Sequence, residues 1–547
     1  MKTRSLTVGD KLMNLLLGFR RIACIPQVQL GVPVVYQLYM LLCLLIGFRF
    51  GTAALPLVAC FAVTDLLMAL LIFHPRIALN GQILCAVNLL FTTGLCAQSV
   101  FVLKYPVTSG MTVSENVISN VIFLAVGAVC GGLCVFVCWV LGRGMELQRR
   151  NAGLGEPTQS TPLVLTLAYV LGVGVLVLSV AVLAMDSLWL VGNSGQPSEF
   201  LKFALLFYLA FVAGLDEDLL PYRRKLLLQV LSYLCVALAY AGQSEFGSLL
   251  VVSVIFALFL LICNKNWLLT GFVVGALAVV LAVILSIVIH FGNLYIEEKY
   301  GSAEPEILSS SVAEPETEES VGEEEETGIF EREYPRPVQA VVDLFTSNYE
   351  KIYMRFMVCI DIDGTRSTTS KGVHDAMENY YAYQARAALQ AIGISRFVPT
   401  NAPVFKYVPI GISDYIYTSV LQTGGYISII VMLLAFVLLA DASFCIVSRN
   451  CPAFCRYLVF VMIGVLQIQM FINVLGVNNC IPLTGITLPF VSRGGTSLTV
   501  CTMMIATVFY ADMTYNAGKQ KYAEACKEED YMEGGVHVED EQRFTVH

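Results

Sequence analysis

The stretch LVLTLAYVLGVGVLVLSVAVLAM, residues 163–185, runs for 23 residues without a charged side chain. A helix needs about 20 apolar residues to cross the hydrocarbon core of a bilayer. Similar runs recur along the 547-residue chain, which is 57% hydrophobic and only 14% charged. Lipid cannot satisfy backbone polar groups, and continuous runs without period-two alternation indicate helices rather than a barrel. The sequence therefore predicts an all-α polytopic membrane protein.

Twelve such runs are expected to span the membrane. In residue numbers they are 33–49, 53–73, 82–103, 117–141, 163–185, 199–215, 225–242, 246–263, 267–290, 416–440, 456–476 and 495–513. Basic residues gather at the N-terminus and in alternate loops, for example Arg149 and Arg150 and the run Arg223, Arg224 and Lys225. The positive-inside rule then predicts that both termini are cytoplasmic.

This topology divides the chain into six parts. They are a cytoplasmic segment 1–32, five spans in 33–185, four spans in 186–290, an extracytoplasmic loop 291–415, three spans in 416–513 with a loop at 476–495 between the last two, and a cytoplasmic tail 514–547. Most of the net charge of −9 comes from residues 304–333, which hold twelve glutamates and one arginine. We expect the surrounding insert, 301–336, to be a disordered, solvated tether. Nothing in the charge pattern indicates nucleic-acid binding.

Two outward helix starts carry ionisable residues. In QPSEFLKFALLF (196–207), Glu199 and Lys202 are three residues apart, so they share a helix face and are expected to pair. In GQSEFGSLL (242–250), Glu245 begins the next outward helix, and Gly247 allows close approach of another backbone. Charged residues near spans often mark function. The structural alternative for both is a capped helix end, with a local ion pair in the first case.

A third outward cluster, PIGISDYIYTSVLQTGG (409–425), places Asp414 at the membrane boundary. An isolated acid there either caps a helix or acts as a base toward a substrate at the outer surface. One further acid, Asp65, lies deep in the second predicted span, where an interhelical hydrogen bond is the favoured interpretation.

The fourth cluster is GITLPFVSRGGTSL (485–498), just before the last span. Gln469 and Asn473 lie upstream, four residues apart and therefore on one helix face. The prolines and glycines predict a loop that bends back into the bundle, where irregular backbone is tolerated only if it is buried or lines a polar cavity. The alternative is that this loop only braces the last two spans.

Five stretches, in this order, resemble the FtsW/RodA/SpoVE (SEDS) family of peptidoglycan polymerases. They are QPSEFLKFAL (196–205), QSEFGS (243–248), YQARAALQAIG (383–393), ISDYIY (412–417) and IPLTGITLPFVSRGGTSL (481–498), the last preceded by Gln469 and Asn473. The resemblance covers residues 185–513 apart from an insertion near 300–375. It implies a SEDS-like core of ten helices, so that two of the N-terminal spans are extra.

The resemblance implies a glycosyltransferase that polymerises lipid II during cell division or elongation. Asp414 is then the candidate catalytic base, because its segment resembles the one that carries the family's proposed catalytic aspartate. The candidate substrate-binding residues are Glu199, Lys202, Glu245, Gln384, Arg396, Gln469, Asn473, Ser492, Arg493, Gly494 and Gly495. Lys202, Arg396 and Arg493 offer positive charge to a diphosphate. No metal ligand is assigned; a divalent cation (Mg or Mn), held by phosphate and Glu199 or Glu245, stays open.

The sequence departs from the family pattern at several positions. Trp189 lies in SLWL without the usual arginine, ISRF follows AIG, Gln422 and Thr423 replace an acidic pair, and Arg493 replaces a tyrosine. These changes leave open a specialised or weakened polymerase. They also keep alive a non-catalytic scaffold, although the retained Asp414, Glu199 and Lys202 count against it.

The resemblance also implies partners and a location. The partners are undecaprenyl-linked lipid II, a class B penicillin-binding protein transpeptidase and the membrane. The location is the bacterial cytoplasmic membrane, with a multi-pass chain and an extracytoplasmic active site. A lipid II flippase is a further alternative, but it needs a polar pathway to both faces, and here the polar clusters lie on the outer side.

Overall fold

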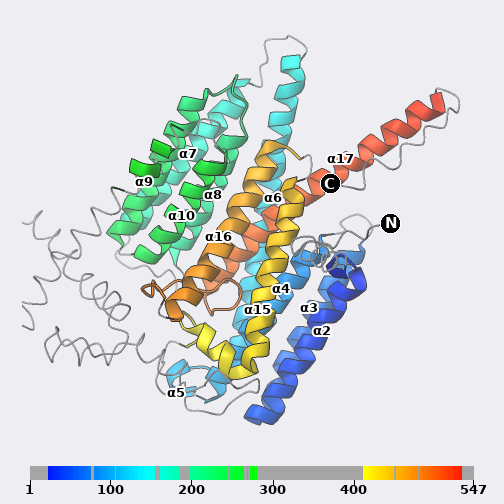
Figure 1. The fold of residues 1–547 in the computed structure, drawn as a ribbon, viewed down its shortest axis with the longest axis vertical. Helices are drawn as coiled ribbons and strands as arrows, with labels where there is room; N and C mark the ends of the chain where they lie inside the picture. Colours follow the sequence, from blue (N-terminus) through cyan, green and yellow to red (C-terminus); the bar gives the residue numbers. More distant parts are fainter. Residues whose placement is uncertain are drawn as a thin grey trace, which may run out of the picture.

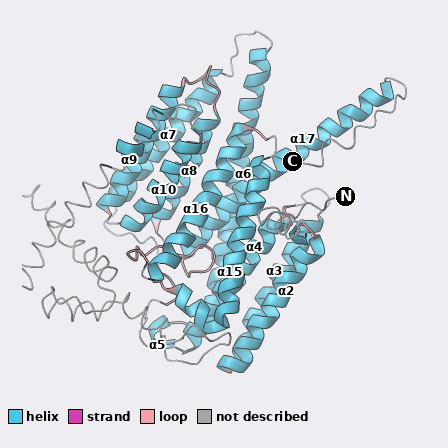
Figure 2. Cartoon of the chain, viewed as in Figure 1, coloured by secondary structure: helices cyan, strands magenta, loops and turns pink. Residues whose placement is uncertain are grey.

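The structure, a computed structural model, describes only part of the chain. The described residues are 22–74, 79–104, 106–153, 161–184, 196–243, 245–263, a few positions between 268 and 279, 411–448, 451–478 and 480–532. Within these ranges the secondary structure is entirely helical, as the sequence predicts (Figure 2).

Ten of the described helices are long and apolar enough to cross a membrane, and they coincide with ten of the twelve predicted spans. They are α2 (Pro26–Leu42) continued by the π turn η1 (Cys43–Gly47), α3 (Leu55–Phe73) preceded by the 3-10 turn η2 (Gly51–Ala54), α4 (Gly81–Lys104), α6 (Val113–Gly153), α7 (Thr161–Ala184), α8 (Pro197–Gly214), α9 (Tyr222–Gly242), α15 (Ile416–Ser448), α16 (Ala453–Val477) and α17 (Gly495–Met532). The protein is therefore a multi-pass membrane protein.

The two other predicted spans stay predictions. The span 246–263 corresponds to α10 (Phe246–Cys263), whose apolar stretch Phe246–Ile262 is shorter than the ten spanning helices. The span 267–290 lies outside the described residues except for a few positions. The acidic insert and most of the loop 291–415 also lie outside them, and the orientation of the termini is not tested.

Several helices are longer than the apolar runs that predicted them. The helix α6 continues to Gly153 and α17 to Met532, past the ends of their spans at 141 and 513. Charged residues are good helix formers, so a helix need not end where its apolar run does. The helix α2 begins earlier than predicted, with Pro26 in its first turn, where the missing amide proton costs nothing.

The helices form one bundle with a buried centre (Figure 1). The helices α7, α8, α9 and α10 lie together on one side, and α2 and α3 lie at the opposite edge. Between them, α17 packs along α6, α15 along α4, and α16 along α8. The helices α4 and α8 are buried over most of their surface, whereas α3, α6 and α7 expose large apolar faces. In a membrane protein such faces contact lipid.

Asp65 joins three helices. The amide of Gln37 on α2 donates to Oδ1 of Asp65 at 3.1 Å, and the amide of Asn88 on α4 donates to the same oxygen at 2.8 Å. The predicted interhelical hydrogen bond is therefore confirmed. Such bonds contribute roughly 0.6 kcal/mol each, and up to about 1.7 kcal/mol, in membrane bundles. Asp65 thus fastens the hairpin of α2 and α3, hereafter the N-terminal hairpin, to α4.

The helix α15 consists of two segments. Gly425 has φ 62° and ψ −160°, a conformation that side-chain-bearing residues rarely adopt. The break leaves carbonyl groups at the end of the first segment, residues 416–424, without their usual helical donors. The hydroxyl of Ser428 lies 2.9 Å from the carbonyl oxygen of Val420, and the hydroxyl of Tyr39 on α2 donates to that of Gly424 at 2.7 Å.

We predict that Asp65→Leu destabilises the bundle by about 1–3 kcal/mol, because the side-chain amides of Gln37 and Asn88 lose their closest acceptor and keep only longer contacts. Asp65→Asn retains an Oδ1 acceptor and should stay closer to the wild type. Thermal unfolding of the purified protein in detergent measures both variants. Equal stability of Asp65→Leu and the wild type would contradict the assigned role of Asp65.

Candidate functional site

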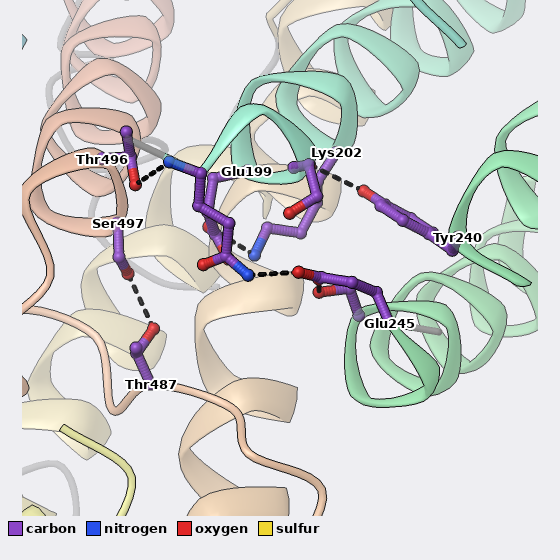
Figure 3. Close-up of polar contacts among 10 residues, drawn as sticks. Glu199, Lys202, Tyr240, Glu245, Thr487, Thr496 and Ser497 are labelled. Atoms are coloured by element: carbon purple, nitrogen blue, oxygen red, sulfur yellow. Dashed lines mark hydrogen bonds and ion pairs between the residues drawn. The ribbon is translucent and has the colours of Figure 1, made fainter. Parts of the chain in front are cut away.

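The four polar clusters meet at one end of the bundle. The starts of α8, α10, α15 and α17 and the end of α16 lie there, because successive helices alternate in direction (Figure 1). Figure 3 shows Glu199 and Lys202 between Tyr240 and Glu245 on one side and Thr496 and Ser497 on the other. Residues almost 300 positions apart in the sequence are therefore neighbours in one site.

The first two turns of α8 carry a buried ion pair. Nζ of Lys202 lies 2.7 Å from Oε2 of Glu199, and the pair that the spacing predicts is confirmed. Lys202 is 1% exposed and Glu199 is 6% exposed. Charges this deeply buried need a partner, because removing one leaves the other desolvated and unpaired. The pair therefore makes the start of α8 depend on both residues.

Gln196, just before α8, links three elements. Its side-chain amide donates to Oε1 of Glu245 at the start of α10, and its backbone amide donates to the hydroxyl of Thr496 on α17 at 3.2 Å. The hydroxyl of Ser248 also donates to Oε2 of Glu245, at 2.8 Å. Glu245 thus connects the start of α10 to the residue before α8. Tyr240 on α9 donates to the carbonyl oxygen of Ser198 at 2.8 Å and closes the same junction.

The loop between α16 and α17, hereafter the signature loop (480–494), enters the bundle as predicted. Val491 is fully buried, and Gln98 on α4 donates to its carbonyl oxygen at 2.8 Å. A Cβ at Gly94 on α4 would lie 2.4 Å from that oxygen, and a Cβ at Gly247 on α10 would lie 2.4 Å from the carbonyl oxygen of Thr484. Both glycines are therefore required for close approach of the loop backbone.

The signature loop holds the backbone around Asp414. Asn473 on α16 donates from one amide nitrogen to the carbonyl oxygens of Asp414, at 2.9 Å, and Ile486, at 2.7 Å. The hydroxyl of Ser492 donates to the carbonyl oxygen of Ser413 at 2.6 Å. Through Asn473 and Ser492, the loop is therefore joined to the backbone of two consecutive residues, Ser413 and Asp414. Asp414 itself is half-buried, and these bonds fix the position of its backbone.

Arg493, Gly494 and Gly495 lie where the signature loop enters α17, and all three are half-buried. The backbone amide of Arg493 donates to the carbonyl oxygen of Ile412 at 2.8 Å. Burial lowers the pKa of the Arg493 guanidinium from its ordinary value, yet arginine stays charged in proteins. The first amides of α17 also provide a partial positive charge. This corner therefore combines a half-buried cation with a helix N-terminus.

Two buried side-chain amides lie on α16, whose end reaches this region. Gln469 and Asn473 are 1% and 2% exposed, and neither Oε1 of Gln469 nor Oδ1 of Asn473 has a hydrogen-bond donor among the described residues. Buried polar atoms normally have a partner. Because the two residues are one turn apart on one face, these acceptors suit a water molecule or a hydroxyl group.

Some site residues were not singled out from the sequence. Gln98, Asn120 and Tyr240 support the signature loop or the start of α8 from inside apolar runs, and Asn120 donates to Oε1 of Gln98 at 2.9 Å. An amide within a membrane span is itself a signal, because lipid disfavours it. Gly94 gave no comparable signal, since only the folded chain brings Val491 against it.

Two predicted site residues, Gln384 and Arg396, lie outside the described residues. The described part of the chain contains no cluster of three or more histidine, cysteine or acidic side chains arranged to hold a metal ion. This does not test the expectation of a divalent cation, because substrate phosphate would supply part of the ligands of that cation.

Comparison with known proteins identifies relatives of this arrangement. The family model FTSW_RODA_SPOVE, described as cell cycle protein, matches residues 90–300 and 364–516. The probable peptidoglycan glycosyltransferase FtsW of Wigglesworthia glossinidia brevipalpis is 29% identical over 146 residues, which are 25% of this chain and 38% of that protein. The stage V sporulation protein E of Bacillus subtilis is 33% identical over 104 residues, 19% of this chain and 28% of that protein.

The matched part of the chain spans about a third of the length of these curated relatives. A chain from the structure described as "Structural coordination of polymerization and crosslinking by a peptidoglycan synthase complex" superposes with a TM-score of 0.47 at 17% identity, covering 80% of this chain and 99% of that one. The family match covers more than half of the chain and includes α8, α10, α15, α16 and the signature loop. The chain therefore belongs to the FtsW/RodA/SpoVE family of cell cycle proteins.

Proposed function

We propose that this protein is a peptidoglycan glycosyltransferase that polymerises lipid II, with Asp414 as the catalytic base. Its family membership and the names of its relatives, including the peptidoglycan glycosyltransferase MrdB of Escherichia coli, support the activity. The single observation that carries the role of Asp414 is its attachment to the signature loop through Asn473 and Ser492. This attachment holds the backbone of the half-buried Asp414 two residues from Ile412, whose carbonyl oxygen accepts the backbone amide of Arg493.

The reaction joins two lipid-linked sugars. A hydroxyl oxygen of one attacks the anomeric carbon of the other, a new carbon–oxygen bond forms, and the bond to the polyprenyl diphosphate breaks. Asp414 accepts the hydroxyl proton, and the leaving diphosphate takes the electron pair of the broken bond. The developing negative charge is stabilised by Arg493 and by the first amides of α17, at Gly494 and Gly495. Gln469 and Asn473 offer acceptors for sugar hydroxyls.

The ion pair between Glu199 and Lys202 has a different role in this proposal. Both side chains are buried and form an ion pair with each other, which supports a positioning role rather than direct contact with diphosphate. Glu245, which accepts from Gln196, holds the start of α10 against α8 in the same way. The substrate-binding role that the sequence predicts for these residues is the alternative, and a double variant separates the two.

The location and the partners are part of the proposal. The distribution of basic residues among the loops supports a site on the extracytoplasmic face of the bacterial cytoplasmic membrane, where lipid II presents its sugars. A class B penicillin-binding protein is the proposed partner, because polymerised strands need crosslinking. A non-catalytic scaffold is the second candidate, favoured by Gln422 and Thr423, which are uncharged and fully buried where the family resemblance leads us to expect an acidic pair.

We predict that Asp414→Asn lowers the rate of lipid II polymerisation about 100- to 10,000-fold, because it removes the base but keeps the shape of the side chain. The rate is measured with purified lipid II and the cognate transpeptidase in reconstituted vesicles. Asp441→Asn, near the other end of α15, is the matched control and should retain activity within about twofold. Full activity of Asp414→Asn would exclude the base role. A wild type that binds lipid II without making strands would favour the scaffold.

We predict that Lys202→Met lowers stability by about 3–5 kcal/mol, because Glu199 is left buried and unpaired. The double variant Glu199→Gln, Lys202→Met removes both charges and should recover most of the stability and most of the polymerisation rate. Thermal unfolding and glycan synthesis are measured on the same preparations. A double variant that is stable but inactive would instead show that the charge of Glu199 or of Lys202 acts on the substrate.

A further inference from the structure

The N-terminal hairpin lies outside the part of the chain that matches the family. The match begins at residue 90, within α4, whereas α2 and α3 end at Leu42 and Phe73. The family match therefore assigns no role to this hairpin. Its contacts with the rest of the bundle lead, however, toward the candidate site.

We propose that the N-terminal hairpin positions Asp414, with Tyr39 as the positioning residue. The hydroxyl of Tyr39 donates to the carbonyl oxygen of Gly424 at 2.7 Å. That carbonyl ends the first segment of α15, and Asp414 lies just before the other end of the same segment. The inference rests on the proposed function, because it assigns Tyr39 a role in the reaction that Asp414 performs.

The hydrogen bond from Tyr39 to Gly424 lies at the break in α15. The unusual conformation of Gly425 interrupts the helix, so the carbonyl of Gly424 needs a donor from outside the segment. Tyr39 supplies it from a different helix. Met40, the next residue, packs on the same spot: a Cβ at Gly424 would lie 2.9 Å from its sulfur atom. The hairpin thus contacts the break through both a hydrogen bond and close packing.

The segment between Gly424 and Asp414 is short and buried. Residues 416–424 form about two and a half helical turns and extend about 13 Å. Thr418, Ser419 and Val420 are fully buried, and the hydroxyl of Ser419 donates back to the carbonyl oxygen of Gly411 at 2.6 Å. A helix this short moves as a rigid unit, so a shift at Gly424 displaces the backbone of Asp414.

The hairpin itself is anchored to α4, which also holds the signature loop. Tyr36, one turn before Tyr39, shares a hydrogen bond of 3.0 Å with the hydroxyl of Thr93. Thr93 is followed directly by Gly94, which lies against the backbone of Val491. The stretch from Asp414 to Gly424 is therefore contacted by the signature loop at one end and by Tyr39 at the other. Both the signature loop and the helix that carries Tyr39 pack against α4.

The neighbouring tyrosines provide a matched test. Tyr39→Phe removes the hydroxyl that reaches α15, and Tyr36→Phe removes a hydroxyl that reaches only α4. Both keep the ring, and the two rings stack with centroids 6.2 Å apart. Each change removes one hydrogen bond, so we expect similar, small losses of thermal stability. Amide hydrogen exchange of residues 411–424 and polymerisation of lipid II are then measured for the full-length protein with its transpeptidase.

Tyr39→Phe should speed exchange of residues 411–424 by about 2- to 10-fold, as the loss of one hydrogen bond permits. Its kcat should fall by a similar factor at unchanged KM, because the base is displaced while the substrate site is intact. Tyr36→Phe should change both measurements less than Tyr39→Phe, because its hydroxyl contacts Thr93 on α4 and not α15.

Equal exchange in the two phenylalanine variants would overturn the inference, as would faster exchange in Tyr39→Phe with a kcat equal to that of Tyr36→Phe. The two proposals fail separately. A wild type that makes no glycan removes the proposed activity and with it the role of Tyr39 in catalysis, whereas the exchange measurement still shows whether the hairpin holds the segment.

Discussion

The site depends on one amide group, that of Asn473, which donates to the carbonyl oxygens of Asp414 and Ile486 together. Irregular backbone inside a membrane bundle must find its hydrogen-bond partners within the protein. Here residues 411–415 and the signature loop are two irregular segments that hydrogen-bond to each other, through the Arg493 amide and the Ser492 hydroxyl. Asn473 on α16 donates to both of them. The backbone of Asp414 is thus placed by hydrogen bonds to its own carbonyl oxygen and to those of the two residues before it.

The helix α4 is buried over most of its surface and carries several polar side chains. Asn88 and Thr93 face the N-terminal hairpin, while Gly94 and Gln98 face the signature loop. A helix that contacted lipid on one face could not present polar groups in both directions. The central position of α4 therefore lets a single element connect the hairpin, which lies outside the family match, to the site within it.

The charges of the site fall into two environments. Glu199 and Lys202 are buried against each other, so their attraction stabilises the start of α8 and leaves little for a substrate. Arg493 is only half-buried, next to the N-terminus of α17, and keeps its charge available at the edge of the bundle. This division separates the groups that build the site from those that can meet an anionic leaving group.

The sequence by itself determined the helical class, ten of the spans that the structure describes and the family, because apolar runs and contiguous motifs are local properties. It also predicted the pair of Glu199 and Lys202, whose three-residue spacing fixes their shared face. Only the tertiary structure decided that Gly94 meets Val491 and that Tyr39 meets Gly424, nearly 400 residues away. No local pattern encodes such contacts, because they depend on how whole helices pack and on a break in α15 that the sequence shows only as two adjacent glycines.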